Sequence, residues 1–300
     1  MEDVSGALHG ACTRDQAVAA LGEHGMRAAL RAGLLCRLWR GVFVPVDRLL
    51  DPRTRAAAAL LLVGEEAVIS GLTAAYLLGC DAAVSCKDVH LTVPYSRRVH
   101  KRPGIVSHND RFSAEDVVEL AGLRVLALDL VIAELLCTGP RWSALACADQ
   151  ALAGCALGQR SDFCDAVRER LRQRDNPKGV RGAHALVALA TAKAESPPES
   201  WLRLIVVDAG FPVPVPQFEV CDLDGQVVYR LDIAWPTLRI ALEYDGYEAH
   251  EDRVEHDAER DRRLVGRGWL TVRATAADLA SPCRLLSELR KAFRARGVHV

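Results

Sequence analysis

The chain has 300 residues, of which 50% are hydrophobic and only 5% aromatic. Its length favours two domains, and its apolar content is ample for a large core built mainly on Ala, Leu and Val. The 38 basic and 39 acidic residues nearly balance, which does not exclude a nucleic-acid partner because local patches matter more than the sum. The longest apolar run, residues 56–63, is too short to cross a bilayer, so we expect no membrane association.

The cysteines and the N-terminus indicate the cellular compartment. The chain has ten cysteines, none of them in a Cys-x-x-Cys pair, so a zinc ribbon is unsupported. Glu2 and Asp3 follow Met1 where a signal peptide would carry basic and then apolar residues. We therefore expect a cytoplasmic protein with free thiols.

The first part of the chain, residues 1–50, has the pattern of a winged helix-turn-helix. Thr13 can cap a helix that Gly22 breaks, and a second helix fits residues 24–32. Residues 35–44 then alternate as a short hairpin around Arg40 and Gly41. Helix, turn, helix and hairpin in this order predict a module whose second helix enters a major groove.

Basic residues on this module are candidates for contact with DNA phosphates. Arg27 and Arg31 lie four residues apart and hence on one helix face, while Arg37 and Arg40 lie on the hairpin. The alternative is a small helical module whose arginines are simply solvated. The pattern leaves both interpretations open.

The same stretch resembles the N-terminal winged helix of the AbiEi antitoxin family. The matching residues are Thr-Arg-Asp-Gln-Ala from Thr13 and Leu-Trp-Arg-Gly-Val-Phe-Val from Leu38. Members of that family repress transcription of their own operons, so the resemblance implies a DNA-binding ancestry and a toxin–antitoxin context.

The middle part, residues 51–194, has a mixed pattern that weakly resembles the middle region of the same antitoxins. Its densest basic run contains Arg97, Arg98, Lys101 and Arg102, which suits phosphate contact or, alternatively, a solvated loop between strands. We expect helices at 53–63, 70–78, 128–137 and 142–153, strands at 88–93, 105–108 and 123–126, and a linker at 168–181.

The last part, residues 195–300, contains the acidic residues that suggest catalysis. Ser196 can cap a helix that carries Glu199 in its first turn. We expect strands at 218–220, 226–235, 239–245 and 270–273, and helices at 253–265 and 279–296. Arg260, on the first of these two helices, is a candidate for DNA contact or for a surface salt bridge.

Strand periodicity brings three carboxylates together. Glu243 and Asp245 point to the same face of one strand, and hairpin pairing can place Asp232 beside them. Clustered carboxylates repel one another unless a cation binds or their pKa values rise. Hard oxygen ligands of this kind suit Mg²⁺ or Mn²⁺. The alternative is that these acids are simply solvated at the end of a strand and bind no metal.

An acid on a helix followed by acids on adjacent strands resembles the PD-(D/E)XK nuclease pattern. Residues 195–300 further resemble an uncharacterised actinobacterial family related to the very-short-patch repair endonucleases. That resemblance implies a catalytic set of Glu199, Asp232, Glu243, Asp245 and His250, with the metal on Asp232, Glu243 and Asp245. The pattern calls for lysine where this chain has Asp245, and the repair-endonuclease relatives use nearby histidines instead, so His250 is the candidate that activates water.

The sequence therefore predicts an α/β chain, α+β overall, with an N-terminal winged helix-turn-helix, an α/β middle region and a C-terminal restriction-endonuclease-like mixed sheet flanked by helices. The leading hypothesis is a DNA-binding, metal-dependent endonuclease that hydrolyses phosphodiester bonds. The alternatives are a non-enzymatic antitoxin-type transcriptional regulator with a degenerate nuclease domain and, more weakly, a component that pairs with a partner toxin protein.

Overall fold

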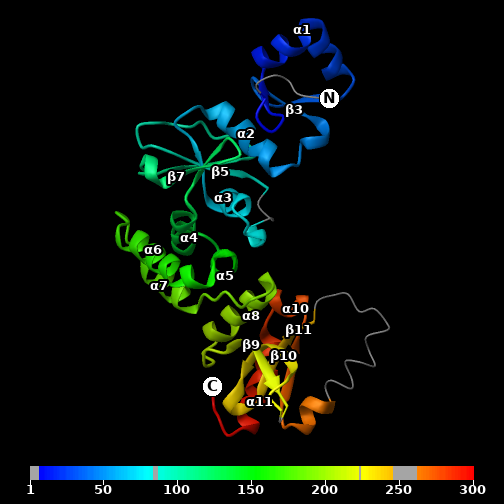
Figure 1. Ribbon diagram of the computed structural model, residues 1–300, viewed down its shortest axis with the longest axis vertical. Helices are drawn as coiled ribbons and strands as arrows, with labels where there is room; N and C mark the ends of the chain where they lie inside the picture. The colour runs from blue at the N-terminus through cyan, green and yellow to red at the C-terminus, as the bar shows by residue number, and fades with distance from the viewer. Residues whose placement is uncertain (1–6, 84–86, 223, 246–261) are drawn as a thin grey trace. The chain divides into compact units, whose positions relative to one another are not determined.

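The computed structural model describes residues 7–83, 87–222, 224–245 and 262–300 (Figure 1). These residues contain helices and three sheets, of which two have mixed strand orientation, and this confirms the mixed α and β class. Contacts divide the chain into a first unit, Met1–Gly139 with Ser161–His184, and a second unit, Pro140–Arg160 with Ala185–Val300. The three-part organisation expected from the sequence stays a prediction. Among the described residues, no helix is both long and apolar enough to cross a membrane.

The first unit begins with the expected helix, break, helix and hairpin. Thr13 forms a capping box, in which its hydroxyl accepts the Gln16 N–H at 3.2 Å and the Gln16 side chain accepts the Thr13 N–H at 2.8 Å. Gly22, with φ of 68°, kinks the helix between its two halves. The elements are α1 Arg14–Arg31, β1 Cys12–Thr13, β2 Leu35–Trp39 and β3 Val42–Pro45, with the sheet order β1-β3-β2.

The first unit also contains a five-stranded sheet with the order β6-β5-β4-β8-β7. Val89, Leu91 and Val93 alternate along β5 and are buried, as strand periodicity requires. Two short strands, β4 and β7, were not expected, because neither shows an alternating run long enough to be recognised. The elements are α2 Pro52–Val63, β4 Val68–Ile69, α3 Gly71–Leu77, β5 Val89–Val93, β6 Ile105–Asn109, β7 Val117–Leu120, β8 Leu123–Leu126 and α4 Leu128–Thr138.

The segment expected as a linker at 168–181 is partly helical, because α6 spans Arg160–Arg172 and α7 spans Val180–Leu189. Val167 and Leu171, four residues apart, form the buried side of α6. Arg170 of the same helix donates both to Asp116, just before β7, and to Asp129, in the first turn of α4. Arg170 therefore attaches a docked helix where the composition indicated a linker.

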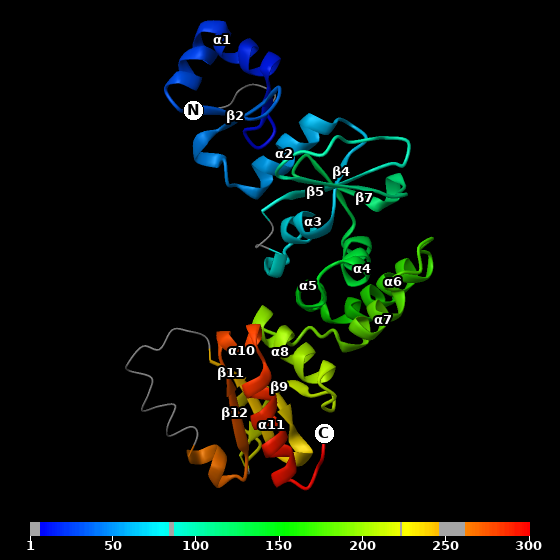
Figure 2. The same ribbon diagram turned by 180° about the vertical axis from the view of Figure 1, so that it is seen from behind.

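The second unit is built on a four-stranded sheet with the order β12-β11-β10-β9, in which β9, β10 and β11 are antiparallel and β12 is parallel to β11. Helices α8 and α11 pack on one face of this sheet, and α11 runs along it in Figure 2. The elements are α5 Arg141–Gly154, α8 Pro197–Asp208, β9 Val215–Cys221, β10 Val227–Trp235, β11 Ile240–Tyr244, β12 Leu270–Ala274, α10 Ala276–Ala280 and α11 Cys283–Ala295.

The helix expected at 279–296 is two helices, α10 and α11. Pro282 separates them because its ring disfavours a helical conformation at the preceding residue, Ser281. The expected helix at 253–265 lies largely outside the described residues, although residues 262–266 are helical.

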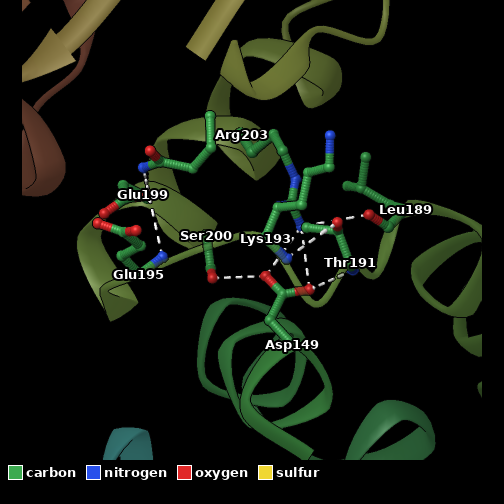
Figure 3. A network of polar contacts seen from close by, with 9 residues as sticks. Asp149, Leu189, Thr191, Lys193, Glu195, Glu199, Ser200 and Arg203 are labelled. Atoms are coloured by element: carbon green, nitrogen blue, oxygen red, sulfur yellow. Dashed lines mark hydrogen bonds and ion pairs between the residues drawn. The ribbon is translucent and has the colours of Figure 1, made fainter. Parts of the chain in front are cut away.

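A buried ion pair joins α5 to α8 (Figure 3). Asp149 and Arg203 are each 1% exposed, and the Arg203 Nη2 lies 2.9 Å from the Asp149 Oδ2. Asp149 also accepts the Ser200 hydroxyl and the Thr191 N–H, and Arg203 donates to the Leu189 carbonyl. The network thus fixes the N-terminal half of α8 against α5 and the segment between α7 and α8.

We expect Arg203→Ala to destabilise the second unit by about 3–5 kcal/mol, because it leaves the Asp149 carboxylate buried without its cation. Arg141→Ala is the matched control, since Arg141 also joins α5 to α8, through Asp208, but its side chain is 54% exposed. Its loss should cost about 0–1 kcal/mol. Denaturant unfolding followed by tryptophan fluorescence measures this, because four of the five tryptophans belong to the second unit. Equal losses from both substitutions would contradict the assignment.

Candidate functional site

Two of the expected acids face each other across adjacent strands. The antiparallel register pairs Ile233 of β10 with Leu242 of β11, and extending it by one residue sets Asp232 opposite Glu243. Directly opposite residues project from the same face of a sheet. The Asp232 Oδ2 accepts the Tyr244 N–H at 2.9 Å, which fixes this carboxylate against β11. Glu243 is only 6% exposed, so both acids are held rather than free in solvent.

The row continues onto both outer strands. The β9–β10 register places Gln217 opposite Asp232, and the parallel β11–β12 register pairs Glu243 with Arg273. Gln217 has φ of 48°, a left-handed conformation that is rare for a residue other than glycine. Neither residue could be identified from the sequence, because a backbone angle leaves no mark there and the position of Arg273 depends on parallel pairing.

Glu199 lies in the first turn of α8 and is 7% exposed (Figure 3). Its carboxylate accepts the Gln217 amide at 2.7 Å, the Ser196 hydroxyl at 2.8 Å and the Glu195 N–H at 3.1 Å. Burial raises the pKa of Glu199, the three hydrogen bonds oppose the rise, and the negative charge of Asp232 adds to it. Glu199 and Asp232 are therefore close enough to interact electrostatically.

The other expected site residues do not join this group of acids. Asp245 is exposed directly after β11, and its backbone N–H donates to the Ala274 carbonyl at 2.7 Å. His250 and Arg260 lie outside the described residues. The structure thus brings Glu199, Asp232 and Glu243 into one neighbourhood and leaves Asp245 at its solvent-exposed edge.

The donor set can be tested for its fit to a divalent cation. Among the described residues, no group of three or more His, Cys, Asp or Glu side chains could hold a metal ion. Mg²⁺, however, is often bound by only one or two carboxylates, with water and substrate phosphate completing its shell. Asp232 and Glu243 fit this arrangement, whereas the carboxylate of Glu199 already accepts three hydrogen bonds.

The expected DNA-binding residues of the N-terminal region lie on α1 and the hairpin. Arg27, Arg31, Arg37 and Arg40 are all exposed. Arg27 also lies 3.6 Å from Glu23, one turn earlier on the helix, in an exposed pair that contributes little to stability. These side chains are thus accessible to a polyanion.

The basic run between β5 and β6 is more varied than its sequence indicates. Arg98 and Lys101 are exposed, and Arg102 is half-buried. Arg97, by contrast, donates to the Val63 carbonyl at 3.1 Å and pairs with Glu66 at 3.5 Å. Arg97 therefore anchors the loop to the end of α2, a role that its position within a basic run does not indicate.

Comparison with known proteins identifies relatives over most of the chain. No protein-family profile matches it. Two proteins of Mycobacterium tuberculosis, Uncharacterized protein Rv2248 of strain H37Rv and Uncharacterized protein MT2308 of strain CDC 1551, are each 30% identical over 272 residues, which is 87% of this chain and 93% of theirs. The chain belongs to the family of these mycobacterial proteins.

The chain is also similar to a solved structure. The crystal structure of the RV2827C protein from Mycobacterium tuberculosis aligns with 73% of this chain and 87% of its own, with a TM-score of 0.43 and 14% identity.

We expect the pKa of Glu199 to lie above its ordinary value of 4.5 and to fall in Asp232→Asn, because the substitution removes a neighbouring negative charge. A group whose folded pKa is raised stabilises the fold below its unfolded pKa, and this stability is lost as the pH rises through the folded pKa. Asp232→Asn should therefore lose less stability over that interval. Carboxyl NMR titration measures the pKa directly. Asp224 is an exposed acid in a turn of the same unit, so Asp224→Asn should leave the pKa of Glu199 unchanged. If Asp232→Asn also left the pKa of Glu199 unchanged, the two acids would not interact.

Proposed function

We propose that this protein binds DNA and that its second unit hydrolyses phosphodiester bonds with a divalent cation. The register that sets Asp232 opposite Glu243, with Glu199 electrostatically coupled to Asp232, is the observation that carries the proposal. The arrangement agrees with the nuclease pattern that the sequence resembles, in which an acid on a helix precedes acids on adjacent strands.

Each residue of the site has a separate chemical role in this proposal. Asp232 and Glu243 would bind Mg²⁺ or Mn²⁺, since both present carboxylate oxygens on the same face of the sheet. When bound, the cation supplies positive charge beside the scissile phosphate. Gln217 holds the carboxylate of Glu199 through its amide, and Arg273 places a cationic residue next to Glu243 in the row.

DNA binding is supported separately by the first unit. The helix, break, helix and hairpin carry five exposed arginines, the four candidates and Arg14, and the residues that resemble the antitoxin winged helix lie within β1, α1, β2 and β3. A surface of this kind contacts phosphates without reading sequence unless its second helix reaches base edges. In this function the first unit locates the DNA and the second unit hydrolyses it.

Purified protein should cleave duplex DNA in the presence of Mg²⁺ or Mn²⁺, and Asp232→Asn should lower the single-turnover rate by roughly 100-fold or more, as expected for losing a group that acts on transition-state charge. Gel analysis of end-labelled duplexes, matched and mismatched, measures this. Asp224→Asn should retain the wild-type rate, because Asp224 lies in the β9–β10 turn. Cleavage by Asp232→Asn at the wild-type rate would assign the activity elsewhere.

The second candidate function is a non-enzymatic regulator of antitoxin type, in which the nuclease-like unit serves for docking. Asp245 at the position of the pattern's lysine, and the lack of a three-ligand group among the described residues, favour it. A partner toxin protein would then be the natural ligand of the second unit.

For this second candidate, we expect protection of DNA upstream of the protein's own gene in footprinting, equal for wild type and Asp232→Asn and independent of Mg²⁺. Equal protection together with undetectable cleavage by the wild type would favour the regulator. Protection that is absent at low salt for every duplex would contradict both functions, because phosphate contacts are strongest there.

A further inference from the structure

The hairpin of the N-terminal region is joined to the basic loop of the middle region by a specific hydrogen bond. The indole Nε1–H of Trp39, at the end of β2, donates to the Pro103 carbonyl at 3.1 Å. Trp39 is followed by Arg40 at the hairpin turn, and Pro103 is preceded by Lys101 and Arg102. One hydrogen bond thus connects the two basic segments that the sequence shows as separate.

The loop end that receives this bond is well fixed. Gly104 has φ of 81°, and its carbonyl accepts the Val89 N–H at 2.9 Å. A Cβ atom at Gly104 would lie 3.6 Å from the Trp39 ring and 3.5 Å from the guanidinium of Arg55. The turn therefore packs between the hairpin and α2, and Arg55 itself donates to the Lys87 carbonyl.

The loop start is fixed as well. The Asn109 amide donates to the Pro94 carbonyl at 3.1 Å and to the Arg97 carbonyl at 2.8 Å, while the Arg97 side chain binds the Val63 carbonyl. With both ends held, Arg98 and Lys101 are exposed on a loop of restricted freedom. Preorganised groups lose less conformational entropy when a ligand binds.

The charged side chains of the two segments are all basic. Residues 35–45 and 94–104 together contain six Lys and Arg side chains and no Asp or Glu, in a chain whose net charge is −1. Of these six, Arg97 is committed to the fold, and the remaining five are Arg37, Arg40, Arg98, Lys101 and Arg102. We call these five residues the hairpin–loop surface.

We propose that the hairpin–loop surface binds phosphates of a single DNA duplex, so that hairpin and loop contact the same turn of the helix. The proposal rests on the DNA-binding part of the proposed function and extends it beyond the winged helix. Arg40 and Arg102 each lie one residue, about 3.8 Å between Cα atoms, from the two hydrogen-bonded residues. Both therefore lie well within the roughly 34 Å that one turn of B-DNA spans.

The test measures binding to a duplex of about 12 base pairs, slightly more than one turn. Fluorescence anisotropy over a salt series, in Ca²⁺ to avoid cleavage, gives the slope of log affinity against log salt. Each lost phosphate contact lowers that slope by about 0.9. We expect a decrease of about 1.8 for Arg98→Ala with Lys101→Ala, and of about 0.9 for Arg40→Ala.

The matched control replaces two exposed cations of the same unit that lie outside this surface, Lys178→Ala with Arg181→Ala. It removes the same charge and should leave the slope unchanged. Trp39→Phe tests the connection itself, since it removes the donor and keeps an aromatic ring. It should weaken binding about fivefold, the equilibrium effect of one net hydrogen bond, although no charge changes. Trp142→Phe, an exposed tryptophan of the second unit, should have no effect.

The outcomes separate this inference from the function on which it rests. If the wild type shows no salt-dependent binding to any duplex, the DNA-binding function itself is wrong. If the wild type binds with a steep slope but Arg98→Ala with Lys101→Ala matches the control, only the hairpin–loop surface is wrong. Tighter binding of an RNA hairpin than of the duplex would also overturn it, because the proposed partner is duplex DNA.

Discussion

Core packing fixes the register between β10 and β11, and the position of the acidic residues depends on that register. Ile233, Trp235 and Leu242 enter the core under α8 and α11, while Asp232 and Glu243 take the alternate positions. A slip of one residue between the two strands would turn the carboxylate of one strand toward the helices and move that strand's apolar side chains to the opposite face. The hydrophobic free energy of a sheet face thus sets the location of charges that contribute nothing to that face.

Much of this site could be predicted from the sequence because strands have a period of two. The facing of Asp232 and Glu243 follows from hairpin order, and the early position of Glu199 follows from Ser196 and the two prolines after it. The mixed α and β class and the capping box at Thr13 could be predicted by the same local rules. Local sequence patterns are therefore sufficient where the interacting residues lie close together in the sequence.

What could not be predicted depends on contacts between distant segments. Arg273 joins the row only through parallel pairing across the long connection between β11 and β12, and Gln217 reaches Glu199 through an unusual backbone angle. Arg97 looks like its neighbours in a basic run, yet its guanidinium binds the carbonyl that ends α2. Composition likewise indicated a linker where Arg170 pairs with two acids. In each case a tertiary partner, invisible to periodicity, decides the role of a charged or polar side chain.

The conformation of Gln217 has a consequence for how this fold balances stability against its polar site. A left-handed angle costs a residue with a side chain on the order of 1–3 kcal/mol, a cost that glycine avoids. Glycine at this position would relax the backbone of β9 but would remove the amide that holds Glu199. The sheet alone thus favours one residue and the buried carboxylate another, so the most stable sequence for this fold and the sequence that preserves its acidic site differ at position 217.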